Sequence, residues 1–138
     1  MKTLIINGIS ARRGGGQTNL INLMNYLNKF NQKVIFILNS SNIENFSQYK
    51  SKRITLYEAR FASFSILHRI LWEWFFLPLL LKKWSADIYY APGGILTSRA
   101  PNCCKSITTL QNMLPFDIIG RSKFPLFSLI RLKFFKKF

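Results

Sequence analysis

Three consecutive glycines, Gly14, Gly15 and Gly16, follow a short apolar stretch and precede an amphipathic one. This order predicts a buried strand, a glycine-rich loop and a helix. Glycine has no Cβ atom to keep a ligand from the backbone, and the free N–H groups at a helix start attract anions. We therefore expect this loop, with Gln17, to suit a phosphate group. Because its spacing matches neither the dinucleotide-binding nor the Walker A motif, the loop alone leaves open a turn that binds nothing.

The other residues with chemical potential do not form a catalytic group. The acidic residues include no close pair suited to hydrolysis, and the spacing of Arg69 and Glu73 predicts an ion pair on one helix. His68 is a lone histidine in an apolar stretch, and no G-x-S-x-G motif is present, which argues against a nucleophilic hydrolase. The adjacent Cys103 and Cys104 are poorly placed to pair with each other, and we expect both to be reduced. With one histidine and no C-x-x-C motif, we expect no metal site.

The composition indicates one folded domain with an anionic partner. The 138 residues are 49% hydrophobic, which is too apolar for a disordered chain. Twenty lysines and arginines against five acidic residues give a formal net charge of +15. Nucleic acid, a membrane surface or a phosphorylated substrate would each suit that charge, and a solvated basic surface is the plainer alternative. The N-terminal apolar run is too short for a signal peptide.

The elements that would position the loop alternate between strand and helix. Residues 18–30 have apolar side chains at helical spacing, and the continuous apolar run at 34–38 is typical of a strand buried on both faces. Further strands are expected at 53–57, 86–91 and 105–110, with a short helical turn at 43–49. This alternation predicts an α/β fold: a Rossmann-like, open, mostly parallel sheet of about five strands with helices on both faces.

Residues 61–84 form the longest apolar stretch. Its length would permit a membrane span, but it contains His68, Arg69, Glu73 and Pro78. Charges at the centre of a span are costly, so we expect a helix that packs in the core or lies at an interface. Pro78 should kink or break this helix near residue 77.

The C-terminal residues 121–138 contain six basic residues and no acidic one, interleaved with bulky apolar residues. We expect a basic helix that lies on an anionic membrane surface. A core helix with a solvated basic side is the alternative, and stacking on nucleic acid is the least supported option. The candidate membrane-facing residues are Arg131, Lys133, Phe134, Phe135, Lys136 and Lys137.

The order of four motifs resembles the N-terminal half of family 4 glycosyltransferases, which have the GT-B fold. After the glycine-rich loop come RILWEWFFLP at residues 69–78, ADIYYAPG at 86–93 and QNMLPF at 111–116. The resemblance covers nearly the whole chain. It implies an acceptor-side Rossmann-like domain that faces a nucleotide-sugar-binding domain across a cleft.

The resemblance also implies roles for particular residues. The glycine-rich loop, Gly14 to Gln17, would contact the diphosphate of the sugar donor. Pro92, Gly93, Gln111, Asn112 and Met113 would line the acceptor side of the cleft. Many relatives have a histidine where this chain has Gln111-Asn112, so the position keeps hydrogen-bonding groups without a protonated one. The nucleotide-sugar would be a co-substrate, no bound cofactor is expected, and the acceptor would be a saccharide or a lipid-linked glycan.

One departure from the family concerns the sugar-donor half. The family has a pair of glutamates, Glu-x7-Glu, in that half, and no two glutamates here have this spacing. We therefore expect a truncated transferase, one domain over 1–138 with an incomplete last helix and without the donor-binding domain, that shows no sugar transfer alone. The expected location is cytoplasmic and peripheral on the inner face of the membrane. The alternative function is a non-catalytic basic module that binds a membrane surface or another partner.

Overall fold

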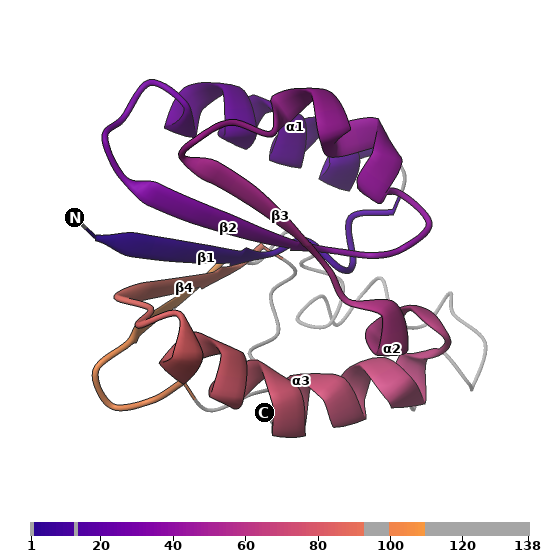
Figure 1. The fold of residues 1–138 in the computed structure, drawn as a ribbon. Helices are drawn as coiled ribbons and strands as arrows, with labels where there is room; N and C mark the ends of the chain where they lie inside the picture. The colour runs from indigo at the N-terminus through magenta and orange to yellow at the C-terminus, as the bar shows by residue number, and fades with distance from the viewer. Residues whose placement is uncertain (1, 13, 93–99, 110–138) are drawn as a thin grey trace, which may run out of the picture.

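A computed structural model describes residues 2–12, 14–92 and 100–109. Within these residues the chain forms a five-stranded sheet in the order β3-β2-β1-β4-β5, and every neighbouring pair is parallel. The strands are β1 (Thr3–Asn7), β2 (Lys33–Leu38), β3 (Ile54–Glu58), β4 (Ile88–Ala91) and β5 (Lys105–Thr108). Helices cover both faces of the sheet (Figure 1). The predicted Rossmann-like α/β fold is therefore confirmed.

The central strand is β1, in which Leu4 pairs with Val34 of β2 and with Ile88 of β4. The chain passes from β1 to β2 through α1 (Gly15–Leu27) on one face. It passes from β3 to β4 through α2 (Arg60–Ser63) and α3 (Ile66–Lys83) on the other face (Figure 1). The strand order reverses between β1 and β4, and the carboxyl ends at such a switch point are where open α/β sheets bind ligands.

Successive residues of the strands point to opposite faces and enter two separate cores. On the α1 side, Ile6 and Phe36 pack with Leu20 and Met24 of the helix. On the other side, a second buried cluster contains Ile5, Ile35, Ile37 and Tyr89 of the strands with Trp72, Leu77 and Leu81 of α3. The strands β1 and β2 are apolar and largely buried on both faces because both faces are covered by helices.

The helix α1 is shifted by three residues toward the amino end, since it spans Gly15–Leu27 where residues 18–30 were predicted. It begins directly after Gly14, which is not helical because its φ is positive, at 65°. Asn28 follows the last helical residue, and its N–H donates to the carbonyl of Met24 at 3.0 Å, while the N–H of Lys29 donates to the carbonyl of Tyr26 at 3.1 Å. Gly15 and Gly16 therefore belong to the first turn of the helix, and Gly14 belongs to the loop that precedes it.

The apolar stretch at 61–84 forms two helices instead of one. The first, α2, ends at Ser63, and α3 begins after Ser65, whose Oγ accepts a hydrogen bond from the N–H of His68 at 3.3 Å. Such a serine cap favours a new helix start. Pro78 was expected to kink or break the helix near residue 77, and it does not break it, since α3 continues through it to Lys83. Proline lacks the N–H that would bond the carbonyl of Trp74, and Trp74 is exposed there.

One smaller prediction is confirmed, and one further contact was not predicted. Residues 43–49 form a single short 3-10 helix, η1 (Ile43–Tyr49), whose Phe46 is fully buried. Asp87, the residue before β4, accepts a hydrogen bond from the N–H of Thr3 at 2.7 Å. This bond holds the start of β1 against the residue that precedes β4.

Candidate functional site

The candidate site lies at the carboxyl edge of the sheet and begins with a crowded glycine. A Cβ atom on Gly8 would lie 2.6 Å from Cδ1 of Leu20 and 3.0 Å from Cδ2 of Leu38. The N–H of Gly8 donates to the carbonyl of Ile37 at 2.8 Å. Glycine therefore allows α1 to approach the ends of β1 and β2 closely, which fixes where the following loop starts.

The predicted phosphate loop lies at the amino end of α1. The N–H groups of Gln17 and Thr18 both donate to the carbonyl of Gly14, at 3.0 and 3.2 Å. Those of Gly15 and Gly16 have no acceptor within the helix. The first turn has no acidic residue, and no described atom lies within 4 Å of where a Cβ of Gly14 or Gly15 would be. Two N–H groups and the positive end of the helix dipole are thus open to an anion.

Two buried asparagines follow β2 beside this loop. The Nδ2 of Asn42 donates to the carbonyl of Ala11 at 2.6 Å, which ties the loop to the segment after β2. Asn39 and Asn42 are 1% and 2% exposed. Yet Asn39 Nδ2 and Asn42 Oδ1 have no hydrogen-bond partner among the described residues. Because an unpaired buried polar group is costly, these two buried atoms mark a place where a water molecule would be stabilised.

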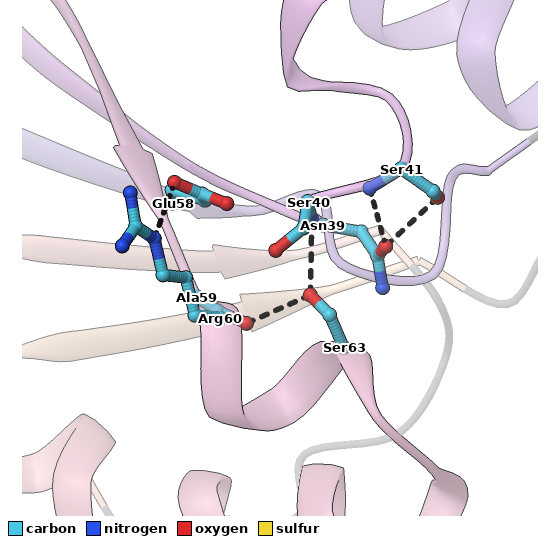
Figure 2. A network of polar contacts seen from close by, with 7 residues as sticks. All are labelled: Asn39, Ser40, Ser41, Glu58, Ala59, Arg60 and Ser63. Atoms are coloured by element: carbon cyan, nitrogen blue, oxygen red, sulfur yellow. Dashed lines mark hydrogen bonds and ion pairs between the residues drawn. The ribbon is translucent and has the colours of Figure 1, made fainter.

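A serine network joins the ends of β2 and β3, as Figure 2 shows. The N–H of Ser40 donates to Oγ of Ser63 at 2.9 Å, and that hydroxyl donates to the carbonyl of Ala59 at 2.8 Å. Both the N–H and the hydroxyl of Ser41 donate to Oδ1 of Asn39, at 3.0 and 2.8 Å. These bonds fix the amide of Asn39 with its oxygen toward Ser41 (Figure 2).

An ion pair lies at the start of α2 in the same region. Nε of Arg60 is 2.9 Å from Oε2 of Glu58, and the arginine side chain is 83% exposed (Figure 2). The hydrogen bond from Arg60, and after it one from Ser40, lowers the pKa of Glu58 below its ordinary value. The same pair raises the pKa of Arg60. Glu58 is therefore a stable carboxylate and an unsuitable general acid at neutral pH.

A second polar group is buried on the α3 side, and we call it the Asn7 cluster: Asn7, Arg69, Glu73 and Tyr89. Nδ2 of Asn7 donates to Oε1 of Glu73 at 3.0 Å and to the hydroxyl of Tyr89 at 2.9 Å. The predicted ion pair is confirmed, since Nε of Arg69 is 2.9 Å from Oε1 of Glu73. Oδ1 of Asn7 accepts from the N–H of Ile9 at 3.2 Å. The cluster therefore joins α3 to β1, to β4 and to the start of the loop.

The sequence alone predicts only half of the Asn7 cluster. Helical spacing predicted the pair of Arg69 and Glu73, but nothing in that spacing indicated Asn7 or Tyr89. A usable signal was present: Asn7 and Asn39 are polar residues that close continuous apolar runs. Polar side chains at the carboxyl ends of parallel strands collect at one edge of the sheet, and both asparagines lie there.

The remaining predicted site residues divide between described and undescribed parts of the chain. Gly14, Gly15, Gly16 and Gln17 lie together at the loop, and Pro92 is buried directly after β4. Gly93 and the predicted cleft residues Gln111, Asn112 and Met113 lie outside the described residues. So do all the candidate membrane-facing residues between Arg131 and Lys137.

Cysteines and metals add little to the site. Cys103 is exposed and Cys104 is buried, and both are free. Burial, followed by the neighbouring Cys103, raises the pKa of the Cys104 thiol, which makes it a poor nucleophile. In the described part of the chain, no three His, Cys, Asp or Glu side chains are grouped so that they could hold a metal ion.

The arrangement as described is suited to binding an anion beside a polar, hydrogen-bonding wall. Family models, curated proteins and solved structures were compared with the chain, and none of them matches it. Over residues 2–12, 14–92 and 100–109, no helix has the length and hydropathy needed to cross a membrane.

Proposed function

We propose that this chain is the acceptor-side half of a family 4, GT-B-type glycosyltransferase, which transfers a sugar from a nucleotide-sugar to a saccharide or lipid-linked acceptor. The observation that carries the proposal is the open amino end of α1, directly after the central strand. The N–H groups of Gly15 and Gly16 have no acceptor within the helix, and the first turn has no acidic residue. A diphosphate is the ligand class that such an end suits best.

The rest of the sheet edge supports a sugar ligand next to that diphosphate. Sugars are bound mainly through hydroxyl groups that both donate and accept hydrogen bonds. Asn39 Nδ2 and Asn42 Oδ1 provide one unused donor and one unused acceptor among the described residues, and Asn42 also contacts the loop at Ala11. The family resemblance assigns Gln111, Asn112 and Met113 to the position beside the transferred sugar.

In the proposed reaction this chain contributes electrostatic and positioning effects. Charge develops on the leaving diphosphate as the glycosidic bond to the donor breaks. Backbone N–H groups fixed at a helix start stabilise that charge without reorganising during the reaction. The Asn7 cluster supports this by holding the first residues of the loop against β1 and α3.

Ligand binding followed by NMR tests the proposal, because chemical-shift changes detect weak complexes. Uridine diphosphate, uridine diphosphate glucose and inorganic phosphate would each be titrated into labelled protein. We expect the two nucleotides to shift the resonances of residues 14–17 and of Asn39. Gly15→Val should weaken nucleotide binding at least tenfold, because a valine there fills space that is open in the free protein.

The matched control is Asn22→Val, which places the same side chain at an exposed position of the same helix. It should leave binding unchanged. Failure of every nucleotide to shift the loop resonances would contradict the proposal. Equal binding of inorganic phosphate and of the nucleotides would indicate a general anion site and would also count against a transferase.

A further inference from the structure

The outer face of α3 is apolar along the length of the helix. We define this face by five side chains with exposed fractions of 47–73%: Leu67, Leu71, Trp74, Phe75 and Leu79. Their spacing of three and four residues places them on one side, opposite the buried Glu73, Leu77 and Leu81. Phe64 and Ile66 extend the exposed apolar surface at the amino end of the helix. An apolar surface of this extent marks an interaction site.

Among residues 58–84, the charges that lie outside ion pairs are positive. Between residues 58 and 84 the carboxylates are Glu58 and Glu73, and both are in ion pairs, with Arg60 and Arg69. Lys82 and Lys83 are exposed in the last turn of α3. The surface therefore presents apolar side chains and positive charge, which complements an apolar, negatively charged partner.

Two other occupants fit this chemistry less well. A second copy of the chain would bring a face with the same positive charge, and neither carboxylate of residues 58–84 is outside an ion pair. A membrane span is not supported, since no helix of the described residues is long and apolar enough to cross a bilayer. A helix that lies in the plane of a bilayer surface does not have to cross the bilayer, and anionic lipids supply the negative charge that a second copy of the chain would not. Its tryptophan and phenylalanines suit the boundary between headgroups and acyl chains, and its lysines suit anionic headgroups.

We propose that the outer face of α3 is a docking surface for an anionic lipid bilayer, with Leu71, Trp74 and Phe75 inserted among the lipids and Lys82 and Lys83 at the headgroups. This assigns membrane contact to α3, which differs from the sequence-based expectation that placed it at residues 131–137. The proposal is independent of the glycosyltransferase function, because it uses no residue of the sheet edge.

Vesicle flotation of the full chain tests the proposal. The vesicles contain either phosphatidylcholine alone or an equimolar mixture of phosphatidylcholine and phosphatidylglycerol. We expect the protein to float with the mixed vesicles and much less with the neutral ones. The double variant Leu71→Ser/Phe75→Ser should lower the partition coefficient at least tenfold, because two large apolar side chains no longer enter the bilayer. Lys82→Gln/Lys83→Gln should lower binding to mixed vesicles by about fivefold per lysine.

Tyr26→Ser is the matched control, since Tyr26 is an exposed aromatic residue on α1, on the opposite face of the sheet. Its partition should equal that of the unchanged protein. Trp74 also provides a spectroscopic readout, because Trp72 is buried and Trp84 is half-buried. Its fluorescence should shift to shorter wavelength with mixed vesicles. Trp74→Phe should remove most of this shift and keep the partition.

Three outcomes would overturn the proposal. The first is no flotation with mixed vesicles. The second is undiminished flotation of Leu71→Ser/Phe75→Ser, which would place the membrane contact elsewhere, for example at residues 131–137. The third is a discrete dimer that this double variant dissociates while vesicles have no effect, which would assign the face to a second copy. Circular dichroism of each variant shows that the fold is retained, and all the substituted positions are exposed.

Discussion

The helices α1 and α3 cover opposite faces of one sheet, and their inner faces are alike while their outer faces are not. Each buries a stripe of apolar residues against alternate residues of the same strands. The outside of α1 is lined by asparagines, whereas the outside of α3 is lined by leucines and aromatic residues. Packing on a sheet determines the residue types on only one side of a helix. The residue types on the other side therefore indicate whether that side faces water or an apolar partner. The asparagines are Asn19, Asn22 and Asn25, with Asn28 directly after the helix.

The two helices also differ in how they are held to the sheet. On the α1 side the closest contact is steric, at Gly8, where any side chain would meet Leu20 and Leu38. On the α3 side the contact includes the buried hydrogen bonds of the Asn7 cluster. To test how each helix is held to the sheet, the free energy of unfolding should therefore be measured after substitution of a polar residue on the α3 side and of Gly8 on the α1 side.

Glu73→Ala should have the largest effect on stability among the substitutions that test how the two helices are held to the sheet. The substitution leaves Arg69 and Asn7 without their shared acceptor in a site where Glu73 is 1% exposed. Removing one partner of a buried ion pair costs about 3–5 kcal/mol, and we expect the lower end because Arg69 is partly exposed. The free energy of unfolding in urea measures this. Asn22→Ala on the outside of α1 is the control, and a loss of similar size in both variants would remove the distinction between the faces.

Gly8→Ala should have the second-largest effect and tests the α1 side. The new methyl group would overlap Cδ1 of Leu20, and overpacking of this kind costs about 1–3 kcal/mol. Adding Leu20→Ala to Gly8→Ala should make the first substitution less costly, which a double-mutant cycle by urea unfolding would show. Gly15→Ala is the matched glycine control because its Cβ would meet no described atom within 4 Å. If Gly8→Ala cost no more than Gly15→Ala, α1 would not be held by close approach.

The fold could be predicted from sequence because its signals are local. The continuous apolar run at Val34–Leu38 required a sheet covered on both faces, and the asparagines every three residues in α1 marked its exposed side. The site could be predicted only where its residues are neighbours in sequence, as in the glycine loop and the pair of Arg69 and Glu73. The contact of Asn7 with Glu73 and Tyr89 spans 66 and 82 residues, so only the folded sheet brings these side chains together.

The helix α3 shows which property of an apolar segment depends on the whole fold. An apolar stretch predicts burial, but it does not say which side is buried. The stretch at 61–84 predicted a core or interface helix without a choice between them, and the structure shows one side of α3 buried in the core and the other exposing apolar side chains. Pro78 was expected to kink or break the helix, but the helix continues because an exposed turn tolerates the missing hydrogen bond.

Leu71→Asn should have a small effect on stability, and this sharpens the comparison of the outer faces. Exposed substitutions away from special features usually change the free energy of unfolding by less than about 0.5 kcal/mol, and Leu71 is 47% exposed. Leu77→Asn, on the inner side of the same helix, should instead prevent stable folding or cost several times more, because Leu77 is fully buried. Urea unfolding of the pair compares them. A large loss from Leu71→Asn would mean that the outer face of α3 is covered in solution by the protein itself.

The smallest expected effect on stability is that of breaking the ion pair of Glu58 and Arg60. This pair is exposed, whereas the pair of Arg69 and Glu73 in α3 is largely buried. Because the hydrogen bond from Arg60 lowers the folded-state pKa of Glu58, the pair contributes stability above the unfolded-state pKa and loses it as pH falls through the folded-state pKa. Arg60→Gln should raise the pKa of Glu58 toward its ordinary value, although the hydrogen bond from Ser40 keeps part of the lowering. An NMR titration of the Glu58 carboxyl carbon measures this directly. Arg53→Gln removes the same charge just before the amino end of β3, far from Glu58 at the carboxyl end, and an equal rise there would show that general charge, and not the contact with Arg60, sets the pKa.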